Sequence, residues 1–233
     1  LHLVSDEETG GEYGSTWLCE HGYAEKADAC LIAEPTSSND IEIGQKGGLH
    51  IVLKAAGKSA HGSLGGFKGD NAILKMAKVL DKLPRLTTIE GHFKDSQRHA
   101  LENSIRSTEE KVGELGSGEV IRHVSANVGL ISGGTRPNMV PDYCEATVDV
   151  RLDHQEIVDM LDSIIAECGV ERITYDLHWK SEGNYTDEDA VIVQTVKKNA
   201  EAVWGLEVIP AYQWASSDAR AYRAQGIPTI QYG

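Results

Sequence analysis

The chain has 233 residues, 40% of them hydrophobic and 25% charged, a globular composition that is long enough for one large or two small domains. Its 36 acidic residues outnumber the 22 basic ones, and the formal net charge of −14 argues against nucleic acid and anionic membranes as partners. No apolar stretch approaches membrane-spanning length. Four widely separated cysteines without a CxxC motif favour reduced thiols, so we expect a cytoplasmic protein.

The N-terminal segment predicts a βαβ unit. Residues 1–4 are an apolar run that ends in Ser5-Asp6-Glu7-Glu8, a glycine-rich turn and a helix around residues 15–20 follow, and residues 27–33 form a second apolar run that ends at Glu34. Ligands of parallel sheets bind beyond the carboxyl ends of the strands. The acidic residues after both predicted strands therefore predict a site at this edge.

The middle of the chain predicts a second fold. Apolar residues alternate in four segments and keep helical spacing in two, and the second helix has a predicted capping box of Asp153 and Glu156. The order β-α-β-β-α-β is typical of a ferredoxin-like arrangement. The segments are strand 49–55, helix 73–83, strand 124–130, strand 144–152, helix 157–168 and strand 173–179.

Two further segments complete the predicted architecture. Residues 97–114 are polar and charged, and we interpret them as a solvated helix or excursion. After residue 181 an α/β pattern resumes, so the simplest fold class is an α/β domain interrupted by a ferredoxin-like α+β insert. The predicted limits are 1–44 and 182–233 for the two parts of the α/β domain and 45–181 for the insert.

The acidic triplet and Glu34 carry the first chemical hypothesis. An acidic triplet in isolation is usually a solvated loop, but charge at the carboxyl edge of a sheet must be hydrated or paired with a metal. One of two adjacent carboxylates can bind a metal while its neighbour faces the attacking water, as metal-assisted amide hydrolysis requires. Glu34 alone could equally be a turn residue before Pro35. In combination with Glu8 we favour a metal ligand.

Short motifs recur in order along the whole chain and together carry a resemblance. They are SDEETGG at 5–11, AEPT at 33–36, GKSAH at 57–61, DNA at 70–72, GGT at 133–135 with Asn138 and Pro141, VDVR at 148–151, SDAR at 217–220 and GIP at 226–228. The set resembles the family of di-zinc metallopeptidases that includes acetylornithine deacetylase, succinyl-diaminopimelate desuccinylase, aminoacylase and carboxypeptidase G. The resemblance implies a zinc-peptidase catalytic domain interrupted by a lid that forms a homodimer.

The resemblance also implies catalytic and metal-binding roles. Glu7 matches the general base that takes a proton from the water held by zinc and passes it to the leaving amine. Glu8 matches a ligand of one zinc ion, and Glu34 a ligand of the other. His61 matches a lid histidine that reaches the partner subunit's active site and hydrogen-bonds the developing oxyanion. Without the resemblance, His61 would be a polar loop histidine.

The implied substrate-binding residues have structural alternatives. Asn138 and Arg151 match lid residues that hold the substrate carboxylate. Asn138 could instead be a turn residue before Pro141, and Arg151 a partner of Asp149 on the sheet face. The remaining residues match a loop that lines the substrate pocket; they are Ser216, Ser217 and Asp218.

The family's HxD ligand motif and its terminal histidine ligand have no counterpart in this sequence, so the resemblance implies a fragment that lacks both ends of the catalytic domain. Each zinc would then keep one protein ligand where three or four are usual. We therefore expect the complete enzyme to bind two zinc ions, replaceable by cobalt or manganese, and this chain alone to bind them weakly and to be inactive.

The predicted reaction is hydrolysis of the amide bond of N-acyl amino acids, by a deacetylase or desuccinylase. Two alternatives stay open. One is a dipeptidase or carboxypeptidase with the same machinery, and the other is a non-catalytic dimerisation or amino-acid-binding module.

Overall fold

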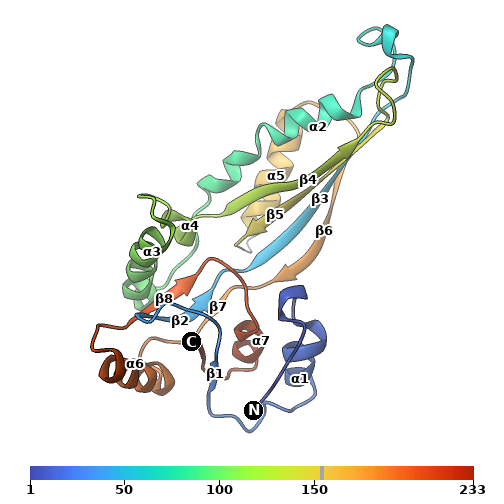
Figure 1. The fold of residues 1–233 in the computed structure, drawn as a ribbon. Coiled ribbons are helices and arrows are strands. Elements are labelled where there is room, and N and C mark those ends of the chain that lie inside the picture. Colours follow the sequence, from blue (N-terminus) through green and yellow to red (C-terminus); the bar gives the residue numbers. More distant parts are fainter. Residues whose placement is uncertain (153–154) are drawn as a thin grey trace. The chain divides into compact units, whose positions relative to one another are not determined.

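The computed structural model describes residues 1–152 and 155–233, which form two compact units (Figure 1). Unit 1 consists of residues 1–47, 91–122 and 182–233, and unit 2 of residues 48–90 and 123–181. The chain therefore passes from one unit to the other four times.

Unit 2 is an antiparallel four-stranded sheet in the order β4-β5-β3-β6 with two helices. This order and the sequence β-α-β-β-α-β confirm the predicted ferredoxin-like fold. Its elements are β3 (Gly48–Ala56), η3 (Gly62–Leu64), α2 (Ala72–Leu80), η4 (Leu83–Thr88), β4 (Ser125–Gly133), β5 (Tyr143–Arg151), α5 (Gln155–Glu167) and β6 (Ile173–Ser181).

Period-two burial builds the core of unit 2. Leu49, Ile51, Leu53 and Ala55 of β3 are buried, while the residues between them are more exposed. They belong to one apolar cluster with buried residues of β5, α2 and α5. The side chain of Asn71 caps α2 by accepting a hydrogen bond from the N–H of Leu74 at 3.1 Å. The predicted capping box includes Asp153, which lies outside the described residues.

Unit 1 contains a mixed five-stranded sheet. β1 (Cys30–Ile32) pairs with β9 (Thr229–Gln231) and β2 (Asp40–Gln45) with β8 (Ile209–Gln213), both in parallel. β2 also pairs antiparallel with β9 and with β7 (Asn184–Tyr185). The remaining elements are η1 (Glu7–Thr9), η2 (Glu12–Thr16), α1 (Trp17–Glu20), η5 (Asp95–Gln97), α3 (Arg98–Val112), α4 (Glu119–Arg122), α6 (Val191–Trp204) and α7 (Ala219–Ala224).

One prediction for unit 1 is wrong, and one of its strands was missed. Residues 1–4 form no strand, and Leu1 and Leu3 are exposed, because no described strand pairs with this segment. β2 was not predicted, since its six residues include Asp40, Glu42 and Gln45, yet all six are buried. None of the helices in the described part of the chain is long and apolar enough to cross a membrane.

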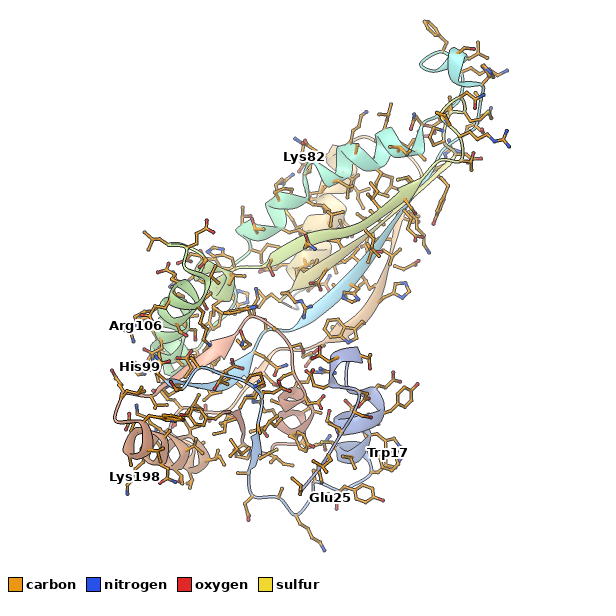
Figure 2. All side chains as sticks on the ribbon, viewed as in Figure 1. Trp17, Glu25, Lys82, His99, Arg106 and Lys198 are labelled. Atoms are coloured by element: carbon orange, nitrogen blue, oxygen red, sulfur yellow. The ribbon has the colours of Figure 1, made fainter. Side chains whose placement is uncertain are left out.

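The third correction concerns α3, which we expected to be solvated. One face of α3 packs on β8 in unit 1, and Ala100, Leu101 and Ser104 are buried there. His99 and Arg106 lie on the exposed side of the helix (Figure 2). The buried face is largely made of small polar residues, which is why the sequence resembles a solvated helix. This packing places residues 91–122 in unit 1, whereas the predicted limits had put them in the insert.

Candidate acidic site

A glycine-rich turn holds the acidic triplet in place. The Asp6 carboxylate accepts hydrogen bonds from the N–H groups of Tyr13 at 2.8 Å and Gly14 at 3.0 Å. Gly11 has φ +65°, and a Cβ there would lie 2.2 Å from Oδ1 of Asp218. Asp6 is therefore a structural residue of the turn, and Gly11 allows the turn to approach Asp218.

Glu7 lies among other carboxylates. Partial burial raises its pKa, and so does repulsion from Glu34, Asp218 and Glu8, while Arg220 opposes the shift. Glu34 follows β1 and Asp218 precedes α7. The fold thus brings the acidic triplet, the end of β1 and the start of α7 to one place, although the triplet lies in the glycine-rich turn and not at the end of the strand expected at residues 1–4.

Arg220 is the residue of this site that sequence reasoning missed. Its guanidinium donates hydrogen bonds to the carbonyl of Gly10, to Oγ of Ser216 at 3.3 Å and to the carbonyl of Ser217 at 3.4 Å. It therefore ties the glycine-rich turn to the loop of residues 216–218. Its position in the SDAR motif at 217–220 could have indicated that Arg220 belongs to the site.

Asp218 is only 4% exposed. Burial raises its pKa, while the nearby Ser15 hydroxyl and the charge of Arg220 oppose the shift. Asp218 is therefore buried next to Gly11 of the glycine-rich turn and borders the site.

Glu8 and Glu34 are the residues that could hold a metal. Within the described residues neither side chain forms an ion pair, and Arg220 only partly offsets the mutual repulsion of the carboxylates around Glu7, which a bound cation would relieve. However, the described residues contain no group of three or more His, Cys, Asp or Glu side chains arranged for a metal. Zinc sites use three or four protein ligands, so these two glutamates fit only part of a zinc site.

His61 and Asn138 lie together in unit 2. The N–H of Gly62 donates to the carbonyl of Asn138 at 2.7 Å, and His61 pairs with Met139 in an isolated bridge. His61 is exposed, and its Nδ1 lies 2.8 Å from the hydroxyl of Ser63. The two predicted lid residues therefore share one exposed loop region.

Arg151 lies at the other end of β5 from that region. The loop that carries Asn138 enters β5 at Tyr143, and the nine-residue strand spans about 26 Å at 3.3 Å per residue. Nε of Arg151 donates to Asp149 at 3.0 Å, and the guanidinium lies 5.5 Å from the ring of Trp179. The hydrogen bond to Asp149 is the one expected if Arg151 has a structural role on the sheet face. Within one chain the structure does not bring Arg151 and Asn138 together.

Residues 43–170, more than half of the chain, match the M20 peptidase dimerisation domain. The chain belongs to the M20 peptidase family. Related sequences include a probable succinyl-diaminopimelate desuccinylase of Staphylococcus epidermidis, 25% identical over 227 residues that cover 95% of this chain and 55% of the relative. A succinyl-diaminopimelate desuccinylase of Magnetococcus marinus is 26% identical, with 99% of this chain and 56% of the relative covered. The chain thus spans about half the length of the curated relatives it matches.

Solved structures of M20 enzymes share the fold. An aminopeptidase from Bacillus cereus matches with a TM-score of 0.68 at 19% identity, covering 99% of this chain and 54% of that one. A dipeptidase from Saccharomyces cerevisiae matches with a TM-score of 0.72 at 13% identity, covering 97% and 57%. At these identities the comparison establishes the architecture alone, a mixed α/β unit with a ferredoxin-like unit.

Proposed function

We propose that the full-length protein, in the cytoplasm, hydrolyses the amide bond of small N-acyl amino acids with two zinc ions. The observation that supports this most is the convergence of Glu7 with Glu8, Glu34 and Asp218 beside a glycine-rich turn. Glu8 and Glu34 would each supply one carboxylate ligand, and cobalt or manganese could replace zinc. The metal supplies Lewis-acid polarisation of the scissile carbonyl. The desuccinylase names of the relatives favour an acyl amino acid over a peptide.

In this proposal Glu7 is the general base. Its raised pKa suits a carboxylate that takes a proton from the attacking water and returns it to the leaving amine. Arg220 holds the turn that carries Glu7 against the loop of residues 216–218. Ser216, Ser217 and Asp218 of that loop would line the substrate pocket.

The residues of unit 2 would complete the site in a homodimer formed through the dimerisation domain. His61 would donate a hydrogen bond to the developing oxyanion, and Asn138 and Arg151 would bind the substrate carboxylate. The length of β5 separates Arg151 from the other two residues in one chain. We therefore propose that His61 and Asn138 of one subunit and Arg151 of the other serve the same substrate.

The substitution Glu7→Gln in the full-length protein tests the catalytic role. Assays with succinyl-diaminopimelate, acetylornithine and dipeptides should show hydrolysis of an acyl amino acid, and the variant should lose about 10²- to 10⁴-fold in kcat with unchanged zinc content. The control Glu12→Gln changes an exposed acid near the same turn and should behave as wild type. Cleavage of dipeptides alone would favour the peptidase alternative, and full activity of Glu7→Gln would refute the role of Glu7.

Zinc titration of this 233-residue chain tests the metal assignment. With one carboxylate from Glu8 and one from Glu34, calorimetry should show binding weaker than about 1 μM, because zinc sites of high affinity use three or four ligands. Sub-micromolar affinity would contradict the incomplete ligand set. The double substitution Glu8→Gln and Glu34→Gln should abolish what binding remains.

A further inference from the structure

A buried polar chain lies behind the proposed site in unit 1. Glu42 of β2 is 4% exposed, and its carboxylate is linked through Gln231 to Ser217. Ser217 is also in contact with Gln45 at 2.8 Å. All four side chains are buried, so each donor and acceptor needs a partner within the protein. Assigning a proton to each hydrogen bond between these side chains shows which protonation state of Glu42 gives every donor and acceptor a partner.

Oε1 of Glu42 is an acceptor in every arrangement. Nε2 of Gln213 donates to it at 2.5 Å, and this amide is held because its Oε1 accepts the N–H of Trp214 at 3.0 Å. Oε2 of Glu42 is the atom that faces Gln231, at 2.9 Å. Any proton that takes part in the chain therefore sits on Oε2.

The amide of Gln45 is also held in one orientation. Its Nε2 donates to the carbonyl of Ser217 at 3.2 Å, and its Oε1 accepts from Nη1 of Arg223 at 3.3 Å. A carbonyl can only accept and a guanidinium can only donate, so the amide cannot turn over. Gln45 thus presents an acceptor oxygen to the hydroxyl of Ser217.

The hydroxyl of Ser217 has one proton but two amide neighbours. With Glu42 ionised, Gln231 donates to Glu42 and accepts from Ser217, and the contact between Ser217 and Gln45 then has no proton. With Glu42 protonated and the amide of Gln231 turned over, Glu42 donates to Gln231, Gln231 to Ser217 and Ser217 to Gln45. Every contact in the chain is a hydrogen bond only in the protonated arrangement.

We propose that Glu42 is a positioning residue that, when protonated, orders the loop of residues 216–218 through Gln231 and Ser217, and loosens it on ionising. This regulation of the site rests on the proposed function, because the loop is assigned to the substrate pocket. On ionisation the O–H bond at Oε2 breaks, its electron pair stays on the carboxylate and the proton passes to solvent, and all other changes are in hydrogen bonds and in the orientation of the Gln231 amide.

The charged groups around Glu42 place this change near neutral pH. Burial raises the pKa of Glu42 to about 7, and the charge of Asp40 adds to the shift. The positive charges of Lys111 and Arg223 oppose the shift, as does the hydrogen bond that Gln213 donates. Nζ of Lys111 lies 2.7 Å from Asp40 but 4.0 Å from Glu42, so it pairs mainly with Asp40. The remaining cation, Arg223, donates to Gln45 and to the carbonyl of Thr229.

The substitution Glu42→Gln tests the proposal, since its amide donates to Gln231 at every pH and so imitates protonated Glu42. Infrared spectra of wild type at pH 6 should contain a carbonyl band of a neutral carboxylic acid that is absent at pH 9 and absent from the variant. Hydrogen exchange at the N–H groups of the loop and of Ala219 should lose about tenfold in protection factor from pH 6 to pH 9 in wild type, as expected for loss of one hydrogen bond, and not in the variant.

Matched variants distinguish an effect of the hydrogen-bonded chain from Glu42 to Gln45 from general effects of pH on the protein. Glu102→Gln on the exposed side of α3 should keep both wild-type changes. Gln231→Met cuts the link while leaving Ser217 free to donate to Gln45, so protection of the loop should become independent of pH. If Glu42→Gln loses protection between pH 6 and pH 9 as wild type does, or if the spectrum of wild type at pH 6 lacks the carboxylic acid band when compared with that of Glu42→Gln, the proposal is overturned.

These measurements need neither zinc nor substrate, so they stand or fall independently of the hydrolase assay. Where hydrolysis is found, kcat/KM of wild type should decline above pH 7 relative to that of Glu42→Gln. Coincident profiles would overturn the effect on the site, even with a neutral Glu42 established by infrared spectroscopy.

Discussion

Replacing Glu42 by glutamine should remove a pH dependence from the stability of unit 1. Burial raises the pKa of Glu42 from 4.5 to about 7, so the folded state holds a proton that the unfolded chain releases between these values. The stabilisation is present at low pH and is lost as the pH rises through 7. Since one pKa unit corresponds to about 1.36 kcal/mol, wild type should lose about 2.5 kcal/mol of unfolding free energy from this group between about pH 5 and pH 8.

Urea denaturation followed by tryptophan fluorescence measures this difference. In a Trp179→Phe background the remaining tryptophans, Trp17, Trp204 and Trp214, all lie in unit 1. The change in unfolding free energy from pH 5 to pH 8 should be more positive by about 2.5 kcal/mol in Glu42→Gln than in its parent, whereas Glu102→Gln should match the parent. Equal changes in Glu42→Gln and parent would refute the assignment of a buried, protonated Glu42.

Three further outcomes are expected. Gly11→Ala should destabilise unit 1 by about 1–2 kcal/mol in urea denaturation, because φ is +65° and the new Cβ would meet Asp218; a neutral result would contradict the close approach. Leu53→Ala, at a fully buried site, should cost about 2–5 kcal/mol in unit 2, against less than about 1 kcal/mol for Val128→Thr on the edge strand. Leu130→Lys, at a 70% exposed position of β4, should shift sedimentation toward the monomer if this edge forms the proposed homodimer, and an unchanged dimer would exclude the edge.

Unit 2 could be predicted from its sequence because its central strands, β3 and β5, each have one buried face. The alternation predicted strands at 49–55 and 144–152, and β3 and β5 occupy Gly48–Ala56 and Tyr143–Arg151. Hydrophobic periodicity reports burial directly in such strands. The same rule failed for residues 1–4, whose apolar side chains have no described strand to pack against.

The buried polar elements of unit 1 could not be predicted in this way. β2 and α3 bury groups whose partners lie far along the chain, such as the hydrogen bond from Ser107 to Asp40. A polar residue with a distant partner has the same appearance in the sequence as a solvated one. The only signal in the sequence for the hydrogen-bonded chain that begins at Glu42 was the presence of this acid and of Gln45, Gln213 and Gln231 in strands.

The acidic site was predictable in part, since the ordered motifs predicted Glu7, Glu8 and Glu34 as neighbours, and Glu8 and Glu34 lie close enough to raise the pKa of Glu7. The strand that was expected to deliver Glu7 and Glu8 does not form. Their roles in catalysis and metal binding stay predictions. The separation of Arg151 from Asn138 was already implied by the predicted strand 144–152, which places Asn138 before its start and Arg151 near its end. The motif match gave the two residues a shared role without taking the length of this strand into account.

The interleaved order of the two units determines when each can fold during synthesis. Unit 2 ends at residue 181, so its whole sheet is synthesised before the segment that supplies α6, β8, α7 and β9. Until then the polar face of α3 has no β8 to cover it, and β2 lacks three strand neighbours. At that stage unit 2 has all its strands while β1 and β2 have none of their strand neighbours, and premature termination after residue 181 would leave β2 as an uncovered template for aggregation.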